Sequence, residues 1–501
     1  MSTNRKKNAH ALSIDLRRRD AIWKLGLLGG SCVLSACGGS NSPSALPASA
    51  QLAATSAALP QQKLAAAQPP LSGPVTQATV AIDTSVVGQL PTDAVGVSIG
   101  KSNIGSKFYS SANTQLIAVY KSLGNSLLRI GGTVVDHTVW TPSGTGNTSG
   151  QVAPPDIDAL AGFLQATGWS VLYGINLMNS TPELAAQEVA YAEQALGSSL
   201  YGIEIGNEPA NDKYTLFANF LTKWQSFATA IRQSSPNVRL TGPAATQAHI
   251  VGYVAPFAQK ERAVIELLTF HYYKSNINAP LTVKGLLSYP DTVLQADLAQ
   301  VSQIAGGMPF RVAETNSISG GGVAGVSNSY ASALWAIDHI MTSVEGGATG
   351  VNFQAGGAAY TPYNETKGPV THIFPEYYGM LFVALAGSGN LLDTKITAND
   401  LNASAYTVRR ADGSLSLIIV NKDAQNNLAA SISLPGTAKS ATLVVMQGPA
   451  LDSLQSPTIQ GASVNADGSF SLPAAYPLEI SQLTASASVP AASAVLVRIV
   501  F

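Results

Sequence analysis

The feature that most constrains the fold of this 501-residue chain is an alternation of two kinds of segment. Short runs rich in apolar and β-branched residues end in polar or glycine-rich turns, and amphipathic segments typical of helices separate them. Strands that alternate with helices form a parallel sheet, and eight such units predict a closed (β/α)8 TIM barrel over residues 93–385. An open doubly wound sheet is the alternative, but no GxGxxG motif follows the first strand. The eight runs are VGVSI (95–99), SLLRIGG (126–132), SVLYGINL (170–177), YGIEIGNEP (201–209), VRLTGPA (238–244), IELLTFHYY (265–273), PFRVAETN (309–316) and TGVNFQAGG (349–357).

The pattern changes after about residue 385. Runs such as LSLIIVN, AASISLPG, ATLVVMQG and SAVLVRIVF are separated by turn residues, and no helix-like segment intervenes. This predicts an antiparallel β-sandwich over residues 386–501. The run TVAIDTS precedes the barrel, and we expect residues 79–92 to supply a strand that joins the sandwich.

The first 37 residues are typical of an export signal. Basic residues, including RRR at 17–19, precede an apolar segment from about residue 25 to 36 that is too short to span a bilayer. It ends in LSAC, the pattern of a lipoprotein signal peptide cleaved before Cys37, and RRDAIWK resembles a twin-arginine signal. An uncleaved amphipathic start is the alternative. Residues 38–78, rich in Ala, Ser and Pro, predict a flexible linker, so we expect an exported periplasmic or cell-surface lipoprotein that meets the membrane only through its N-terminal lipid.

The charge of the chain limits its partners. Only 11% of the residues are charged, and removal of residues 1–37 changes the net charge from −1 to −6. Without a basic block, nucleic acid is not an expected partner, and a polyanionic chain would receive little electrostatic attraction. Both cysteines, Cys32 and Cys37, lie in the signal region, so we expect the stability of the mature chain to come from a large apolar core.

Two glutamates lie where such a barrel holds its active site, at the C-terminal ends of the strands. Glu208 follows the fourth strand in GNEP, and Glu314 ends the seventh in RVAETNS. Glycosidic cleavage needs one carboxyl group that protonates the leaving oxygen and one that attacks the anomeric carbon, and a separation of about 5–5.5 Å gives retention. Glu204 has the same strand parity as Glu208 but lies deeper, so we expect a structural acid paired with Arg129 or Arg311. Support of Glu314 is an alternative role for Arg129.

These motifs also carry a family resemblance. GNEP after a fourth strand, with a glutamate at the seventh, is typical of the clan A glycoside hydrolases. Together with LLRIGG, HYY and AETNSISGGG, the pair resembles glycoside hydrolase family 79, the family of β-glucuronidases and heparanases. The resemblance covers about residues 79–501 and implies a glucuronide as the carbohydrate substrate. We expect no cofactor and no metal, because His271 has no second histidine at ligand spacing.

The resemblance assigns roles to individual residues. Glu208 corresponds to the acid/base and Glu314 to the nucleophile. Asn207 corresponds to an asparagine that bonds the sugar 2-hydroxyl, and Tyr272 to a tyrosine close to the nucleophile. The other implied sugar contacts are those of Gly320, Gly321 and Tyr360 with the uronate carboxylate, of Asp136 near the non-reducing end, and of Gln247 and Gln354.

Ordinary structural roles are open at the same positions: a helix start at Glu208, a flexible loop at the glycines, packing for the tyrosines, a cap for Asp136 and a polar side chain on the surface for Gln247. The chain also departs from the family pattern. Gly100 and Lys101 stand where some members have an acid, and Gln354 stands where a histidine, or a glutamine with a longer loop, is expected. The resemblance therefore does not identify the residues that contact the sugar 3- and 4-hydroxyls.

The resulting prediction is a retaining exo-β-glucuronidase that releases β-linked glucuronic acid, with or without a 4-O-methyl group, from glycans or glycoconjugates by double displacement. An endo-acting, heparanase-like enzyme is one alternative, although the net charge of −6 argues against basic subsites. A β-glucosidase or β-xylosidase of clan A is another, and it would not need the glycine loop. A non-catalytic sugar-binding lipoprotein would not need two matched carboxylates.

Overall fold

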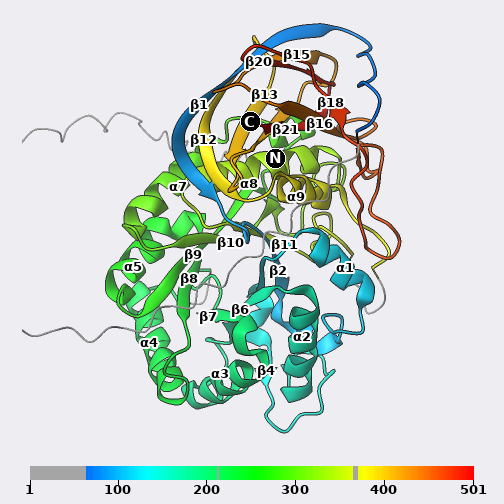
Figure 1. Cartoon of the computed structure of the whole chain (residues 1–501). Coiled ribbons are helices and arrows are strands. Elements are labelled where there is room, and N and C mark those ends of the chain that lie inside the picture. Colours follow the sequence, from blue (N-terminus) through cyan, green and yellow to red (C-terminus); the bar gives the residue numbers. More distant parts are fainter. Residues whose placement is uncertain (1–63, 212–213, 365–369) are drawn as a thin grey trace, which may run out of the picture. The chain divides into compact units, whose positions relative to one another are not determined.

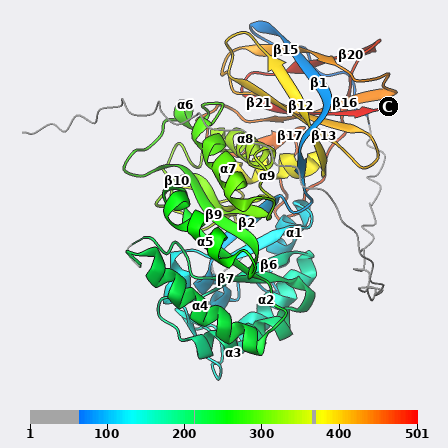
Figure 2. The same ribbon diagram turned by 90° about the vertical axis from the view of Figure 1, so that its left-hand side faces the viewer.

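The computed structural model describes residues 64–211, 214–364 and 370–501, and its central feature is a closed barrel of eight parallel strands (Figures 1 and 2). Each predicted run supplies one strand, so the (β/α)8 barrel is confirmed and the open sheet is wrong. Around the barrel, the strands are β10 (Phe310–Ser319), β11 (Val351–Gln354), β2 (Val95–Gly100), β3 (Leu127–Gly131), β6 (Ser170–Ile175), β7 (Leu200–Ile205), β8 (Leu240–Thr246) and β9 (Ile265–Asn276).

Helices connect successive barrel strands, and local sequence signals set their ends. Helix α3 begins with a proline after the cap residue Thr181, whose hydroxyl accepts a hydrogen bond from the Leu184 N–H, and it ends at Gly197. Helix α2 likewise begins with prolines and ends at Gly168 in the left-handed conformation. The helices are α1 (Thr114–Ser122), α2 (Pro154–Thr167), α3 (Pro182–Leu196), α4 (Phe217–Ser234), α5 (Ala255–Glu261), α6 (Val283–Leu286), α7 (Thr292–Ala305), α8 (Ala331–Glu345) and α9 (Pro375–Ala386).

Two buried arginines lie on different strands of the barrel, and each has its own partners. Arg311, on β10, donates hydrogen bonds to the Asn352 side chain (2.6 Å) and to the backbone oxygen of Asp93 (2.7 Å). Arg129, on β3, donates to Glu204 (2.7 Å). The expected ion pair of Glu204 is thus made with Arg129, and the alternative partner Arg311 is wrong. A buried charge needs such partners, because an unpaired one would be very costly.

The second sheet contains the C-terminal strands and one strand from the other end of the chain. Strand β1 (Val75–Leu90) runs antiparallel to β12 and parallel to β15, so the sheet is antiparallel except at this pair. The strand begins at Val75, four residues before the predicted start, so the predicted linker is shorter than residues 38–78. The other strands are β12 (Gly389–Thr397), β13 (Ala403–Arg409), β14 (Leu415–Asn421), β15 (Asn427–Ser433), β16 (Ser440–Gln447), β17 (Thr458–Ile459), β18 (Tyr476–Pro477), β19 (Ile480–Ser481), β20 (Thr484–Val489) and β21 (Ser493–Val500).

Helix α8 joins the barrel to this sheet. Its Asp338 accepts from Lys422 Nζ at 2.7 Å and from the Tyr406 hydroxyl at 3.0 Å, and all three side chains are buried or nearly so. The described part of the chain packs as one unit that extends to Phe501, so the division into domains at residue 385 remains a prediction. The predicted signal peptide and Cys37 lie outside the described residues. Within the described ranges, no helix is long and apolar enough to cross a membrane.

Candidate active site

Glu314 lies inside strand β10 and is held by two hydrogen-bond donors. Strand β10 continues to Ser319 beside β9, so Glu314 does not end its strand as expected. Arg129 Nη1 donates to Glu314 Oε2 at 2.7 Å, and the Tyr273 hydroxyl donates to Oε1 at 2.8 Å. The residue is only 8% exposed. Both oxygens of this carboxylate are therefore oriented by groups that are themselves fixed in the sheet.

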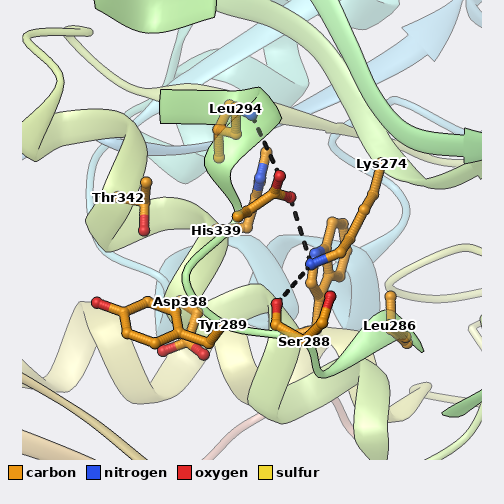
Figure 3. A pocket seen from close by; sticks show the side chains of 10 residues that line it. Lys274, Leu286, Ser288, Tyr289, Leu294, Asp338, His339 and Thr342 are labelled. Carbon is orange, nitrogen blue, oxygen red and sulfur yellow. Dashed lines mark hydrogen bonds and ion pairs between the residues drawn. The ribbon is translucent and has the colours of Figure 1, made fainter. Parts of the chain in front are cut away.

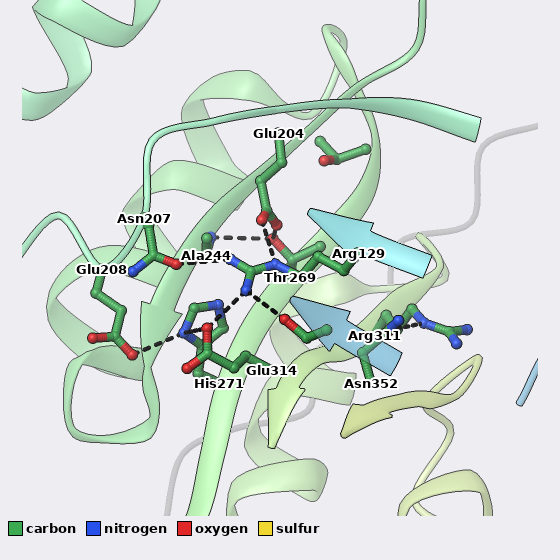
Figure 4. A network of polar contacts seen from close by, with 12 residues as sticks. Arg129, Glu204, Asn207, Glu208, Ala244, Thr269, His271, Arg311, Glu314 and Asn352 are labelled. Atoms are coloured by element: carbon green, nitrogen blue, oxygen red, sulfur yellow. Dashed lines mark hydrogen bonds and ion pairs between the residues drawn. The ribbon is translucent and has the colours of Figure 1, made fainter. Parts of the chain in front are cut away.

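The guanidinium group of Arg129 connects several side chains of this site by hydrogen bonds (Figure 4). Besides Glu314 and Glu204, it donates through Nη2 to Asn207 Oδ1 at 2.8 Å. Burial lowers the pKa of Arg129, but Glu204 and Glu314 outweigh that effect, and the pKa ends above its usual value. Both expected roles of Arg129 are thus present in one side chain. Because a guanidinium has only donors, it also fixes which end of the Asn207 amide faces away from it.

Glu208 lies on a turn three residues beyond the end of β7. Its backbone is left-handed (φ 43°), a conformation that is strained for a residue with a side chain and is often found at functional sites. The Glu208 N–H donates to the Ala244 carbonyl (2.8 Å), and Ala244 is left-handed too (φ 54°). His271 Nδ1 lies 2.9 Å from Glu208 Oε1, and Asn211 Nδ2 donates to Oε2 at 2.7 Å. The turn thus aims the carboxyl group at His271 and Glu314 (Figure 4).

The two glutamates face each other across His271. One carboxylate oxygen of Glu208, one of Glu314 and a ring nitrogen of His271 all lie within 4.8 Å of one another. A cation could use such a spacing, but the Arg129 guanidinium already supplies a positive charge 2.7 Å from Glu314. We therefore keep the prediction that the site uses no metal. This spacing is shorter than the separation of about 6.5–9.5 Å that leaves room for a water molecule between the two carboxyl groups.

The tyrosine beside Glu314 is Tyr273, and the predicted assignment of Tyr272 is wrong. Side chains alternate between the two faces of a strand, so His271 and Tyr273 point into the barrel and Tyr272 points out. The Tyr272 hydroxyl donates to Asp291 at 3.0 Å, and its ring stacks on His339 of α8 with 5.7 Å between centroids. Strand parity within IELLTFHYY is the sequence signal that identifies Tyr273.

A chain of contacts leads from Glu314 to the glycine loop. The rings of Tyr273 and Tyr360 lie 6.0 Å apart between centroids. Burial raises the pKa of Tyr360 to about 12, although its contacts with the Tyr273 hydroxyl and the Gly321 backbone act in the opposite direction. Gly320 and Gly321 both have positive φ angles (87° and 102°), which only glycine adopts easily. The structure therefore brings Gly321, Tyr360 and Tyr273 together.

Gln247 and Asp136 are engaged by the backbone. Gln247 Oε1 accepts from the Tyr273 N–H (2.7 Å), and its Nε2 donates to the Tyr273 carbonyl (3.0 Å). Gln247 therefore positions Tyr273, and its contact with the sugar stays a prediction. Asp136 is buried, and its Oδ1 accepts from the N–H groups of Leu177 (3.0 Å) and Met178 (3.1 Å). Asp136 thus caps the turn after β6, the structural role that was open for it.

Gln354 and Lys101 stand at the two positions where the sequence departs from the family pattern, and the structure shows the contacts of both. Gln354 ends β11, and its Nε2 donates to the Ala355 carbonyl at 3.1 Å. Its Oε1 is buried without a partner among the described residues, so it can accept a hydrogen bond from a bound hydroxyl group. Lys101 is completely buried and pairs with Glu188 at 2.5 Å. Lys101 therefore supports the packing of α3 and is not available to a sugar.

A small polar cavity lies on the outer side of β9, between α6, α7 and α8 (Figure 3). Its volume is about 10 Å³, enough for about one water molecule. Lys274 Nζ donates to the Ser288 carbonyl at 2.9 Å and lies 3.3 Å from Asp291 at its edge. His339 also lines it, and burial lowers the pKa of His339 to about 3. His339 Nε2 of this neutral imidazole lies 2.8 Å from the hydroxyl of Thr315, the residue after Glu314. The side chains around the cavity therefore help to hold strand β10 in place.

Comparisons with known proteins agree with this fold. The chain matches no protein-family model. It is 26% identical to heparanase of Mus musculus over 293 residues, and it spans about half the length of that relative (54%). A solved 4-O-α-L-rhamnosyl-β-D-glucuronidase of Fusarium oxysporum 12S has a TM-score of 0.67 at 18% identity, covering 85% of this chain and 99% of that one. A family 51 arabinofuranosidase of Xanthomonas axonopodis pv. citri has a TM-score of 0.64 at 14% identity, covering 85% and 100%.

The barrel and the facing carboxylates are those expected of a glycoside hydrolase, and the chain is similar to proteins of that class. Within that class the chain is a homologue of heparanase, and its resemblance to glycoside hydrolase family 79 is confirmed.

Proposed function

We propose that this chain is a retaining exo-β-glucuronidase. The observation that carries the proposal is the pair of carboxylates within 4.8 Å, one of which is connected through Tyr273 and Tyr360 to a glycine loop. The pair supplies the two groups that double displacement needs. The loop supplies a place for an anion, because backbone N–H groups bind a carboxylate without a counter-charge.

In the first step, Glu314 attacks the anomeric carbon while Glu208 gives its proton to the glycosidic oxygen, so the bond to the leaving group breaks and a glycosyl ester forms. In the second step, Glu208 takes a proton from water, whose oxygen attacks the same carbon and releases Glu314. Arg129 and Tyr273 orient Glu314 for both steps. Asn207 accepts from Arg129 through its oxygen, and its N–H2 group is assigned the role of donor to the sugar 2-hydroxyl.

We assign the uronate carboxylate to the glycine loop beside Tyr360. Gly320 and Gly321 have positive φ angles, the Gly321 backbone contacts the Tyr360 hydroxyl, and Tyr360 is only 7% exposed. Because burial raises the pKa of Tyr360 to about 12, the hydroxyl stays protonated and can donate at neutral pH. A glucoside or xyloside carries no carboxylate and would leave these donors without a partner. Gln354 is assigned to a ring hydroxyl through its buried oxygen.

We also propose that the mature chain is exported and carries lipid on Cys37. The proposal rests on the LSAC pattern after an apolar run and on the linker that follows. Incorporation of labelled palmitate into the chain, abolished by Cys37→Ala, is the expected result. Labelling that persists in this variant would overturn the assignment.

The activity is tested by hydrolysis of 4-nitrophenyl β-glucuronide beside the β-glucoside and β-xyloside. We expect the glucuronide to be preferred by at least about 100-fold in kcat/KM, since unpaired buried donors are costly with the other two sugars. A glucoside cleaved equally well would overturn the substrate assignment. Proton NMR of the first-formed sugar should show the β-anomer, and the α-anomer would overturn the retaining mechanism.

A further inference from the structure

Glu204 precedes Glu208 by four residues, and both of its carboxylate oxygens are bound by side chains of other strands (Figure 4). Arg129 Nε, on β3, donates to Glu204 Oε2 at 2.7 Å, and the Thr269 hydroxyl, on β9, donates to Oε1 at 2.7 Å. All three side chains are completely buried. An ionised carboxylate only accepts hydrogen bonds, so Glu204 fixes the direction in which both donors point. Two series of hydrogen bonds lead from these donors to the site.

The first series runs through the Arg129 guanidinium to Glu314. The bond from Nε to Glu204 fixes the plane of this rigid group. Its other nitrogens then reach Glu314 Oε2 (Nη1, 2.7 Å) and Asn207 Oδ1 (Nη2, 2.8 Å). The motif LLRIGG leaves room for this arrangement, because a Cβ atom at Gly131 would lie 2.5 Å from the guanidinium carbon. The orientation of Glu314 therefore depends on Glu204 through a single side chain.

The second series runs through the Thr269 hydroxyl to the turn of Glu208. Because the single hydroxyl hydrogen is donated to Glu204, the hydroxyl oxygen acts as an acceptor, and the Ala244 N–H donates to it at 3.1 Å. The Ala244 carbonyl accepts from the Glu208 N–H at 2.8 Å. Ala244 and Glu208 are both left-handed (φ 54° and 43°), and such a conformation persists only where neighbouring groups hold it. The Thr269 hydroxyl is one of these groups.

We propose that Glu204 is a positioning residue for both carboxylates of the site, and that it acts on Glu314 through Arg129 and on the Glu208 turn through Thr269. This inference rests on the proposed function and extends it to the group that holds the two carboxylates in register. A carboxylate that only offset the charge of Arg129 would not need the second series. Small displacements of a reacting group lower rates strongly, so the loss of either series should appear in the kinetics as well as in stability.

Thr269→Val tests the second series, because valine has nearly the shape of threonine and lacks the hydroxyl. The measurement is kcat/KM for ethyl and 4-nitrophenyl β-glucuronide, which covers the steps up to the glycosyl ester. We expect a loss of about 30-fold with the ethyl compound, whose leaving oxygen needs the proton of Glu208, and of less than about threefold with the 4-nitrophenyl compound. Thr269→Ser retains a hydroxyl and should restore most of the activity on the ethyl compound.

Thr241→Val is the matched control. Thr241 is also completely buried, lies beside Glu204 in the pairing of β8 with β7, and donates its hydroxyl to the Ile203 carbonyl at 3.2 Å. The variant removes a buried hydroxyl of the same kind without breaking either series. The ratio of the two kcat/KM values should therefore stay within about twofold of the parent ratio.

Glu204→Gln tests both series together. The amide keeps one acceptor oxygen, and its N–H2 group must face one of the two donors, which then loses its partner and moves. We expect both substrates to lose at least about tenfold in kcat/KM, and the ethyl compound to lose more. Thr269→Val decides the second series even where Glu204→Gln does not fold.

Equal losses on the two substrates in Thr269→Val, no loss on either, or a change of ratio that Thr241→Val reproduces would overturn the inference. Glu204 would then be only the counter-ion of Arg129, and the glucuronidase assignment would stand. A loss below about threefold on the 4-nitrophenyl compound in Glu204→Gln would overturn the first series. Failure of the parent chain to cleave 4-nitrophenyl β-glucuronide would instead overturn the proposed function, and the inference with it.

Discussion

The two carboxylates of the site are built in different ways. Glu314 sits within a barrel strand, is 8% exposed and has both oxygens bound by buried donors, Arg129 and Tyr273. Glu208 sits on a left-handed turn beyond its strand, and its partners are His271 and Asn211. The first environment holds a charge in a fixed position. The second leaves a carboxyl group that can change partners as its proton leaves and returns.

This difference follows from the chemistry proposed for each group. A nucleophile must be ionised and aligned with the anomeric carbon, so positively charged and hydroxyl donors suit it. An acid that later acts as a base must exist in both protonation states during one cycle. A turn on which Glu208 is bound by His271 and Asn211 suits that requirement better than a strand on which Arg129 forms an ion pair with the carboxylate.

The largest expected effect is that of Glu314→Gln. Loss of the attacking carboxylate should lower kcat by at least about 1000-fold on every glucuronide, because no other group is placed to form the glycosyl ester. The measurement is steady-state hydrolysis of 4-nitrophenyl β-glucuronide. In the glycine variant at this position, added azide should give the α-azide, the product of direct displacement. Retention of more than a tenth of the parent rate would show that Glu314 is not the nucleophile.

Glu208→Ala should have the next largest effect, and it should depend on the leaving group. With alkyl glucuronides we expect a loss of about 100- to 10,000-fold, since a poor leaving group needs its proton. With 4-nitrophenyl glucuronide the loss should be at least tenfold smaller, and added azide should give the β-azide. An equal loss on both substrates would contradict the role of proton donor and remove the contrast between the two carboxylates.

A smaller effect is expected from Tyr273→Phe, which removes one donor to Glu314. The kcat should fall by about 100-fold, a typical effect of losing one oriented donor in an active site. Tyr272→Phe is the matched control, because this neighbouring hydroxyl binds Asp291 outside the barrel. It should leave kcat within about threefold and lower the free energy of unfolding by about 1 kcal/mol. The opposite order of the two effects would restore the assignment made from the sequence.

The alternation of side chains along each strand predicts which residues point into the barrel, and the family resemblance does not supply this information. Parity placed Glu204 inside the barrel with a buried arginine, and the structure has that pair. The same rule, applied to His271, would have selected Tyr273 instead of Tyr272.

The alternation of side chains could not predict the roles of Gln247 and Asp136. Their side chains accept hydrogen bonds from backbone N–H groups of distant segments, at Tyr273 and Leu177, and only the closed barrel brings these groups together. The position of Glu314 inside its strand likewise depends on pairing that continues to Ser319 beside Asn276 of β9.

The smallest expected effect concerns a third carboxyl group, Glu376, which is buried in the first turn of α9 behind the Glu314 half of the site. Burial raises the pKa of Glu376 to about 8, and the Asn316 side chain on β10 offsets this only in part. Below pH 4.5 the folded and unfolded chains both hold the proton, so there is no cost. As pH rises from about 4.5 to about 8, the unfolded chain loses the proton first, and the folded state loses stability.

Glu376→Gln should therefore leave the unfolding temperature unchanged at pH 4 and raise stability at pH 8.5 by about 1–4 kcal/mol. Thermal unfolding across this range measures the difference. Glu266→Gln is the matched control, because this glutamate is exposed, with a side chain that is 53% accessible beside Arg239. Its effect should stay below about 0.5 kcal/mol at both pH values. A difference that stays constant across this pH range would mean that the buried carboxyl group of Glu376 does not make the folded state less stable as pH rises.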